Sequence, residues 1–244
     1  MRKLSGKRYW LIGASEGLGR AVAFELAKAG AQVVVSARNA ERLEELATEI
    51  GDGAEAMSVD IASRESVVAA AEKVGEIDGV VFLAGVYWPM KATEWDAEAA
   101  ETMADINFTG AFRCLGAVVP GMVKRGAGHV VITGSLSGFR GLPGAIGYGA
   151  TKAGVMSLAE TMKFDLKDTG VDVQLINPGF IKTRMTDKNE FNMPFIMEPE
   201  AAAELFVRHM RSEKFSLSFP WLFSRFFRGS QFLPDWLYYR VFRM

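Results

Sequence analysis

The sequence of 244 residues has little cysteine and histidine: one Cys114, and two histidines, His129 and His209. A single cysteine excludes an internal disulfide, and so few thiol and imidazole groups far apart argue against a structural zinc site, so no metal is expected. Cys114 stands near Phe112 and Leu115 and is interpreted as a small core residue. His129 opens an apolar run and is interpreted as structural.

An excess of charge of one sign is also absent. The 28 basic and 29 acidic side chains leave a net charge of −1, which gives no reason to expect nucleic acid as a partner. No uncharged run approaches the roughly 18 apolar residues that cross a bilayer, and residues 1–8 lack the apolar stretch of a signal peptide. The expectation is a cytoplasmic protein.

Short apolar runs alternate with helical repeats along the chain, as in a globular α/β protein. Strands are expected at 9–12, 32–36, 54–60, 79–83, 129–133, 171–176 and 214–219. Helices are expected at 17–29, 40–50, 63–74, 148–169 and 198–211, with a helical region at 95–125 that is interrupted near Gly110 or Pro120. This order predicts a Rossmann-like, doubly wound parallel sheet with helices on both faces, in a single domain over residues 1–219.

A glycine-rich turn joins the first expected strand to the first helix, with glycines at 13, 17 and 19. Glycine permits a tight turn and a close backbone approach, and the N-terminus of the helix presents unpaired N–H groups to a pyrophosphate. The turn therefore predicts a dinucleotide site. Its expected cofactor contacts are Gly13, Ser15, Glu16, Gly17, Leu18 and Gly19.

The end of the second strand reads Ser36-Ala37-Arg38. A carboxylate there would bind the ribose 2′-hydroxyl of NAD(H), whereas a guanidinium pairs with the 2′-phosphate of NADP(H). With no acid at this place, NADP(H) is predicted, NAD(H) is less favoured, and Ser36 and Arg38 are assigned to the cofactor. The alternative is that Arg38 is a solvated residue of the next loop; Glu16 gives no help to a phosphate.

Tyr148 and Lys152 stand four residues apart on an expected helix, so both side chains lie on one face. A phenol has a reference pKa of about 10, and a neighbouring ammonium lowers that value. Ser135 follows the strand at 129–133 and could donate a hydrogen bond to the same substrate oxygen. The alternative is a Tyr and a Lys on an exposed helical turn.

These motifs, taken in order, resemble the short-chain dehydrogenase/reductase family over roughly residues 7–183, about three quarters of the chain. The matching positions are Gly13-x-x-x-Gly17-x-Gly19, Asp60, Ala84-Gly85, Asn107, Ser135, Tyr148-x-x-x-Lys152 and Asn177-Pro178-Gly179. One departure is Phe82-Leu83 before Ala84-Gly85, where the family often has two asparagines, so their side-chain hydrogen bonds are missing here.

The resemblance implies cofactor contacts along the chain. Asp60 and Ile61 would lie near the adenine, and Thr183 near the nicotinamide carboxamide. Asn107 would hold a water that passes protons toward Lys152. The remaining implied cofactor contacts are Ala84, Gly85, Tyr148, Lys152, Pro178, Gly179 and Ile181.

The implied activity is hydride transfer between NADP(H) and a carbonyl or secondary alcohol. Tyr148 would protonate the developing alkoxide, Ser135 would stabilise that oxygen, and Lys152 would lower the pKa of Tyr148 and hold the nicotinamide ribose. The partner is a small-molecule carbonyl or alcohol, and the relatives are commonly homodimers or homotetramers. The alternatives are the same chemistry with NAD(H), or a non-catalytic NADP(H)-binding sensor or scaffold.

Two apolar segments follow the last motif. The loop after Thr183 is expected to close over a hydrophobic substrate, with structural packing as the alternative; its apolar residues are Met185, Phe191, Met193, Phe195 and Met197. Residues 220–244 form an aromatic and basic tail with one acid, Asp235. Packing on the pocket or on a partner subunit is favoured for this tail and peripheral membrane association is second, because Gly229 and Pro234 break a single long helix.

Overall fold

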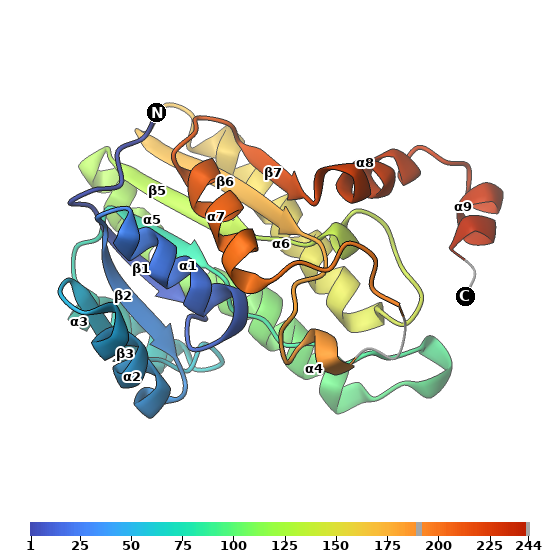
Figure 1. Cartoon of the computed structure of the whole chain (residues 1–244), viewed down its shortest axis with the longest axis horizontal. Helices are drawn as coiled ribbons and strands as arrows, with labels where there is room; N and C mark the ends of the chain where they lie inside the picture. The colour runs from blue at the N-terminus through green and yellow to red at the C-terminus, as the bar shows by residue number, and fades with distance from the viewer. Residues whose placement is uncertain (189–191, 243–244) are drawn as a thin grey trace.

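The computed structural model describes residues 1–188 and 192–242, so the expectation for Phe191 lies outside the described residues. Seven parallel strands form one sheet in the order β3-β2-β1-β4-β5-β6-β7 (Figure 1). The strands are β1 (Arg8–Ile12), β2 (Gln32–Ala37), β3 (Ala54–Ser58), β4 (Gly79–Phe82), β5 (Gly128–Thr133), β6 (Val171–Pro178) and β7 (Ser216–Phe219). The predicted Rossmann-like doubly wound sheet is confirmed.

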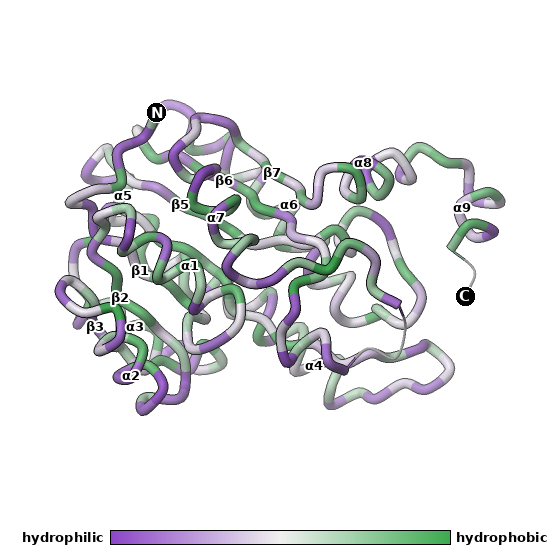
Figure 2. The backbone as a smooth tube through the Cα atoms, in the orientation of Figure 1, coloured by the Kyte–Doolittle hydropathy of each residue, from purple (hydrophilic) through white to green (hydrophobic). Residues whose placement is uncertain are grey.

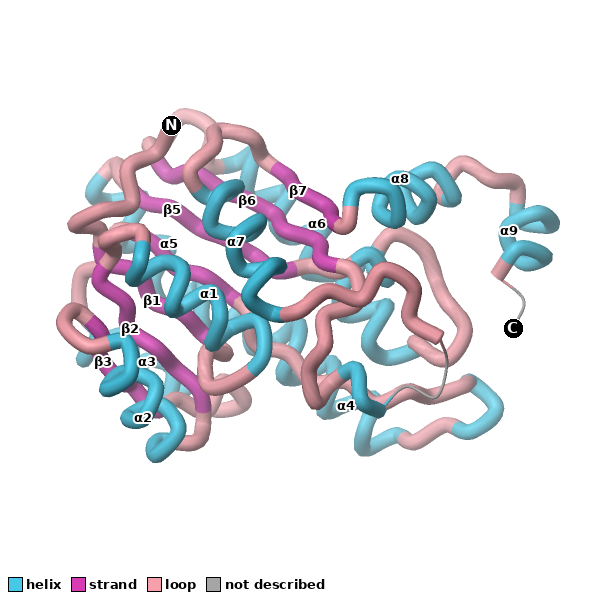
Figure 3. The backbone as a smooth tube through the Cα atoms, viewed as in Figure 1, coloured by secondary structure: helices cyan, strands magenta, loops and turns pink. Residues whose placement is uncertain are grey.

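Helices connect the strands (Figure 3). Their bounds are α1 (Gly17–Lys28), α2 (Ala40–Ile50), α3 (Arg64–Val74), α4 (Ala97–Ala104), α5 (Gly110–Arg125), α6 (Ile146–Asp165), α7 (Pro199–Met210), α8 (Trp221–Ser230) and α9 (Asp235–Val241). The N-termini of α2 and α3 are fixed locally, because the side chains of Asn39 and Ser63 accept hydrogen bonds from the backbone N–H groups of Arg42 and Ser66.

The sheet separates two hydrophobic cores. One face is covered by α1, α2 and α7, with Val22, Leu43 and Phe206 buried among them. The other is covered by α3, α5 and α6, where Val67 and Cys114 are buried. Figure 1 shows α1 and α7 in front of the sheet with α5 and α6 behind it, and in Figure 2 the strand β2 is coloured mostly hydrophobic. Burial of both faces explains why the strands are continuous apolar runs.

The helical region at 95–125 contains the expected interruption, and it lies just before Gly110. Residues Asp105–Thr109 form a π-helical turn between α4 and α5. Pro120 stays inside α5 and does not end it.

Helix α6 is shorter than predicted. It ends at Asp165, and residues 166–170 form turns, because the N–H groups of Lys167 and Thr169 bond to carbonyls three residues back. Because the apolar periodicity continues through Leu166, the sequence pattern did not indicate that the helix ends at Asp165. His129 has the structural role that was predicted: it is buried in β5, with Nδ1 2.9 Å from the Tyr9 hydroxyl and Nε2 3.0 Å from Gln174 Oε1.

One helix of the described residues, the continuous segment Ala97–Arg125, is long and apolar enough to cross a membrane by length and composition. This is weak evidence of a span, since core helices of soluble proteins meet the same criteria. In this fold the segment packs against α3 and α6.

Phe206 provides a test of the α1–α7 core, because its side chain is 0% exposed between α7 and the sheet. We expect Phe206→Ala to lower the free energy of unfolding in urea by about 3–5 kcal/mol, through lost burial and the cavity that remains. Phe164→Ala removes the same ring from a site on α6 that is 79% exposed, and should change stability by about 0.5 kcal/mol or less. Equal losses for the two variants would contradict this account of the core.

Candidate active site

A cavity of about 1000 Å³ opens at the carboxyl ends of the strands, where the chain crosses from one half of the sheet to the other. This is the position at which doubly wound sheets bind ligands. Most of the predicted site residues lie in its wall: Gly13, Ser15, Glu16, Gly17, Leu18, Gly19, Arg38, Ile61, Ala84, Gly85, Ser135, Tyr148, Lys152, Pro178, Gly179, Ile181 and Thr183. Three others, Ser36, Asp60 and Asn107, do not line it.

The glycine turn is built by close backbone contact. Gly13 has φ +95°, and a Cβ there would lie 2.5 Å from the backbone of Ala84 in the loop after β4. A Cβ at Gly19 would lie 2.0 Å from the carbonyl oxygen of Gly13. Any side chain at either position would push the turn away from β4, so both glycines are required for its shape.

The N-terminus of α1 is left open to the cavity. Its N-cap residue, Glu16, makes no side-chain hydrogen bond to the first turn, unlike Asn39 in α2 and Ser63 in α3. The first N–H groups of the helix therefore point to the cavity without a cap, as binding of a pyrophosphate requires. The turn fits the diphosphate of a dinucleotide.

The end of β2 brings two cations to the cavity. Arg38 and Arg42 both line it. Arg42 lies 3.4 Å from the Glu16 carboxylate, whereas Arg38 has no carboxylate within ion-pair distance among the described residues. Ser36 is a correction: it is buried, and its hydroxyl accepts a 2.7 Å hydrogen bond from Trp10 Nε1 beneath the sheet surface. Side chains alternate along a strand, and position 36 faces the core.

Asp60 does not itself line the cavity, and its predicted place near the adenine stays a prediction. It is exposed, and its carboxylate accepts a 3.0 Å hydrogen bond from the backbone N–H of Ala62, so it shapes the turn after β3. The cavity is lined on this side by the neighbouring side chains of Val59 and Ile61. Val59 and Ile61, on either side of Asp60, therefore form an apolar surface in the cavity wall that could contact a flat ring of a ligand.

Three hydroxyl groups gather at the end of β5. The Ser137 hydroxyl donates a 2.9 Å hydrogen bond to Ser135 Oγ, and Ser135 in turn is hydrogen-bonded to Tyr148, which lowers the pKa of the phenol. Burial outweighs this effect and raises the pKa of Tyr148 to about 12. The Tyr148 phenol is thus expected to be protonated at neutral pH, with the Ser135 and Ser137 hydroxyls beside it in the segment that follows β5.

Lys152 is buried, 3% exposed, and its Nζ donates a 3.0 Å hydrogen bond to the carbonyl of Thr133. The ammonium lies 5.6 Å from the centroid of the Tyr148 ring, and burial lowers the pKa of Lys152 to about 8. The expected lowering of the Tyr148 pKa by Lys152 is not seen in this geometry, where loss of solvent dominates both groups. The Lys152 ammonium is oriented by its hydrogen bond to the Thr133 carbonyl of β5, not by a contact with the Tyr148 hydroxyl.

Asn107 lies in the π-helical turn and holds the loop after β4. Its Oδ1 accepts a 2.7 Å hydrogen bond from the N–H of Val86, and its Nδ2 donates to the Val86 carbonyl at 2.9 Å and to Thr151 Oγ1 at 3.2 Å. The extra residue of the π turn directs this amide toward the loop. These bonds hold the loop after β4, in which Phe82 and Leu83 stand where asparagines were expected from the family resemblance.

The segment after β6 lies on the glycine turn. A Cβ at Gly17 would be 2.8 Å from Thr183 Cγ2, and the next residue, Arg184, forms an ion pair with Glu16. Of the loop residues expected to close over substrate, Met185 lines the cavity, whereas Met197 packs on the core and its backbone bonds to Phe180 and Lys182. Packing therefore accounts for Met197, and closure of the loop over a substrate stays a prediction.

Several residues of the cavity wall were not predicted. Tyr87 packs edge-on against Tyr148, with ring centroids 5.1 Å apart. The tail supplies Phe223, Phe227 and Phe242. For the tail, packing on the pocket was one of the two arrangements favoured from the sequence, although no individual residue was assigned to it. Arg42 stands one helical turn after Arg38 and could have been found from that spacing, whereas no sequence pattern indicates Tyr87.

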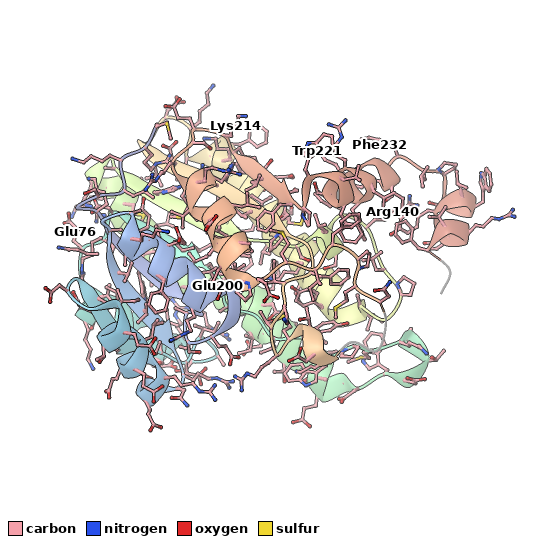
Figure 4. The ribbon with its side chains drawn as sticks, viewed as in Figure 1. Glu76, Arg140, Glu200, Lys214, Trp221 and Phe232 are labelled. Atoms are coloured by element: carbon pink, nitrogen blue, oxygen red, sulfur yellow. The ribbon has the colours of Figure 1, made fainter. Side chains whose placement is uncertain are left out.

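The tail is attached through the loop between β5 and α6. The guanidinium of Arg140 donates to the carbonyls of Ser230 and Leu233, forms an ion pair with Asp235 and lies 3.9 Å from the centre of the Tyr238 ring. The Tyr238 hydroxyl donates a 2.8 Å hydrogen bond to the carbonyl of Gly141. Figure 4 shows Arg140 beneath α8 and α9.

Asn107 offers a test of how the cavity is held open. We expect Asn107→Ala to lower the free energy of unfolding by about 1–3 kcal/mol, because the N–H and carbonyl of Val86 lose their partners. Asn107→Asp retains the size of the side chain but faces the Val86 carbonyl with an oxygen, so it should destabilise as well. Urea unfolding of both variants checks this; a wild-type stability for the Asp variant would contradict the role given to the amide.

Comparison with known proteins agrees with this geometry. The sequence profile of the family described as short chain dehydrogenase matches residues 7–193. An uncharacterized oxidoreductase of Myxococcus xanthus is 37% identical, covering 98% of this chain and 97% of its own. An uncharacterized oxidoreductase of Staphylococcus epidermidis is 33% identical, covering 85% of this chain and 92% of its own.

Solved structures give the same result. A short-chain dehydrogenase from Sphingobium yanoikuyae, in complex with NADPH, has a TM-score of 0.82 at 27% identity and covers 88% of both chains. A 3-ketoacyl-(acyl-carrier-protein) reductase from Brucella melitensis, complexed with NADH, has a TM-score of 0.81 at 25% identity, covering 88% of this chain and 97% of its own. This chain therefore belongs to the short-chain dehydrogenase/reductase family of NAD(P)(H)-binding oxidoreductases.

Proposed function

We propose that this protein is an NADP(H)-dependent oxidoreductase that transfers hydride between nicotinamide and the carbonyl or secondary alcohol of a small hydrophobic substrate. The observation that carries the proposal is the presence of Ser135, Tyr148 and Lys152 in one cavity with the open glycine turn and Arg38. The cofactor, when bound, supplies the hydride chemistry. The residues of the chain position the reactants and transfer the proton to or from the substrate oxygen.

Tyr148 is the proton donor in the reducing direction. Its pKa of about 12 keeps the phenol protonated at neutral pH, and an alkoxide is a stronger base than the phenolate that remains. Ser135 binds the same substrate oxygen as its negative charge grows, and Ser137 holds the Ser135 hydroxyl in place. In the oxidising direction the deprotonated phenolate would accept the proton of the alcohol.

Lys152 holds its ammonium at the centre of the site, fixed by the carbonyl of Thr133. With a pKa of about 8 it is mostly charged at neutral pH and is able to donate to the ribose of the nicotinamide nucleotide. Thr133 Oγ1 also lines this region and is buried without a hydrogen-bond partner among the described residues. A polar group of the cofactor would satisfy it.

The preference for NADP(H) rests on the two arginines at the end of β2. Arg38 has no carboxylate partner, and the acid nearest to Arg42 is Glu16, which is shared with Arg184. No acidic residue follows β2 at the position where NAD(H) would need one, and Asp60 points into its own turn. A 2′-phosphate would find one free guanidinium and one partly neutralised.

The substrate end of the cavity supports a hydrophobic ligand. Its wall there includes Leu142, Phe180, Phe223 and Phe227, and the ring of Phe180 lies 5.8 Å from that of Phe223. Such a wall stabilises apolar groups and offers few hydrogen bonds to a polar one. Small hydrophobic or aromatic ketones and aldehydes are the substrate class that fits.

Tyr148→Phe tests the catalytic assignment. Removal of the phenolic proton should lower kcat about 10²–10⁴-fold on a ketone that the wild-type protein reduces, while NADPH binding by fluorescence titration is unchanged. The substrate is found by following NADPH oxidation over a panel of ketones, aldehydes and quinones. A variant with wild-type kcat would exclude Tyr148 as the acid; a wild-type protein that binds NADPH and reduces nothing would favour the sensor function.

Arg38→Leu tests the cofactor preference. We expect kcat/KM for NADPH to fall roughly tenfold to a hundredfold, through loss of a charged hydrogen bond to the 2′-phosphate, with little change for NADH. Arg64→Leu is the control, because Arg64 is exposed on α3 and does not line the cavity. Equal loss with both cofactors, or a wild-type preference for NADH, would contradict the assignment.

A further inference from the structure

The tail helices have two different faces. In α8 the inner arc contains Phe223, Ser224 and Phe227, of which the two aromatic residues line the cavity. At 100° per residue the opposite arc contains Trp221 and Leu222, which are exposed, whereas Phe226 lies at its margin with its ring 5.6 Å from that of Phe242. The inner arc is thus occupied by the protein's own cavity, and the outer arc is apolar and uncovered.

Helix α9 and the connecting turn repeat this arrangement. Tyr238 is buried against Arg140, whereas Trp236 is 70% and Phe232 86% exposed. Figure 4 shows Trp221 and Phe232 on the outer side of α8, away from the domain, and Figure 1 shows the two helices beyond β7 at the edge of the molecule. Large exposed aromatic rings therefore come from three successive segments of the tail, and those of Trp221 and Phe232 lie on the outer side of α8.

Unpaired cations lie among these rings. Arg225 and Arg228 are on the outer arc of α8 and Arg240 is on α9, and none of the three has a carboxylate within ion-pair distance among the described residues. The acid of this segment, Asp235, is already paired with Arg140 of the domain. The outer face is therefore positively charged as well as apolar.

A second cavity, of about 470 Å³, lies between β7 and α8 at the base of this face. It is lined by Ser216, Ser218, Ser224, Arg225, Arg228, Gly229 and Phe232. Two guanidinium groups and the hydroxyls of an edge strand can donate hydrogen bonds to one anionic group. The apolar rings beside it would then extend past that anion into a less polar medium.

We infer that the outer face of α8–α9 docks on the surface of an anionic lipid bilayer, with a headgroup phosphate in the cavity between β7 and α8. Tryptophan and tyrosine beside arginine are the composition of proteins that lie in the bilayer interface. Helices of 10 and 7 residues are too short to cross the membrane, so the segment lies on it.

A second copy of this chain fits the face less well. A two-fold contact would place the same patch on both sides, so that Arg225, Arg228 and Arg240 of each copy would face those of the other. An anionic surface neutralises these charges instead. Since the inner sides of the same helices line the large cavity, docking would bring the wall of the substrate site to the bilayer.

Vesicle co-sedimentation of the full-length protein, without cofactor or substrate, tests the inference. We expect binding to vesicles of phosphatidylglycerol and phosphatidylcholine, no binding to phosphatidylcholine alone, and release at high salt. Arg225→Gln combined with Arg228→Gln should weaken the partition coefficient about fivefold for each arginine removed. Trp221→Ser combined with Phe232→Ser should weaken it as well, because the rings no longer enter the interface.

The control is Arg64→Gln combined with Arg208→Gln, which makes the same change in net charge at exposed positions on α3 and α7. This variant should bind as the wild type does. Equal binding of all variants would overturn the inference. A wild-type protein that does not bind the vesicles would overturn it as well. If sedimentation velocity also showed that the Trp221→Ser, Phe232→Ser variant dissociates an oligomer, the face would be a contact between copies. Neither result bears on the oxidoreductase assignment.

Discussion

The close approach of two backbone turns at the centre of the sheet is the constraint on which the site depends. β1 and β4 are neighbours in the sheet although α1, β2, α2, β3 and α3 separate them in the chain, and the turns that follow them meet at Gly13 and Ala84. No side chain fits between them. This contact fixes the start of α1, and with it the direction of the N–H groups that face the cavity.

The same crossing explains why residues far apart in sequence share one enclosed space. The chain adds β2 and β3 on one side of β1 and the later strands on the other side, which opens a crevice at the carboxyl ends of the central strands. Residues of the loops after β1, β2, β4, β5 and β6 all line this crevice. Enclosure changes the chemistry of the side chains there. Loss of solvent raises the pKa of Tyr148 and lowers that of Lys152, so the two values lie further apart than they do in water.

The C-terminal segment joins this site to the surface of the molecule. Phe223 contacts both Phe180 of the loop after β6 and Phe227 of its own helix, so the substrate end of the cavity is completed by the last residues of the chain. The anchoring of the tail is concentrated on Arg140, which bonds to two carbonyls, one carboxylate and one aromatic ring. The pocket and the exposed aromatic face therefore depend on the same side chain.

The sequence by itself determined the sheet, most helix limits and the glycine turn. These follow from local patterns, namely the apolar period and glycines where a backbone must pass closely. Only the tertiary structure decided the direction of Ser36 and Asp60, the state of Lys152 and the position of the tail. Those depend on which face of a strand is buried and on how much water remains near a charge. Neither quantity is a property of a short stretch of sequence, because each is set by what packs against it from elsewhere in the chain.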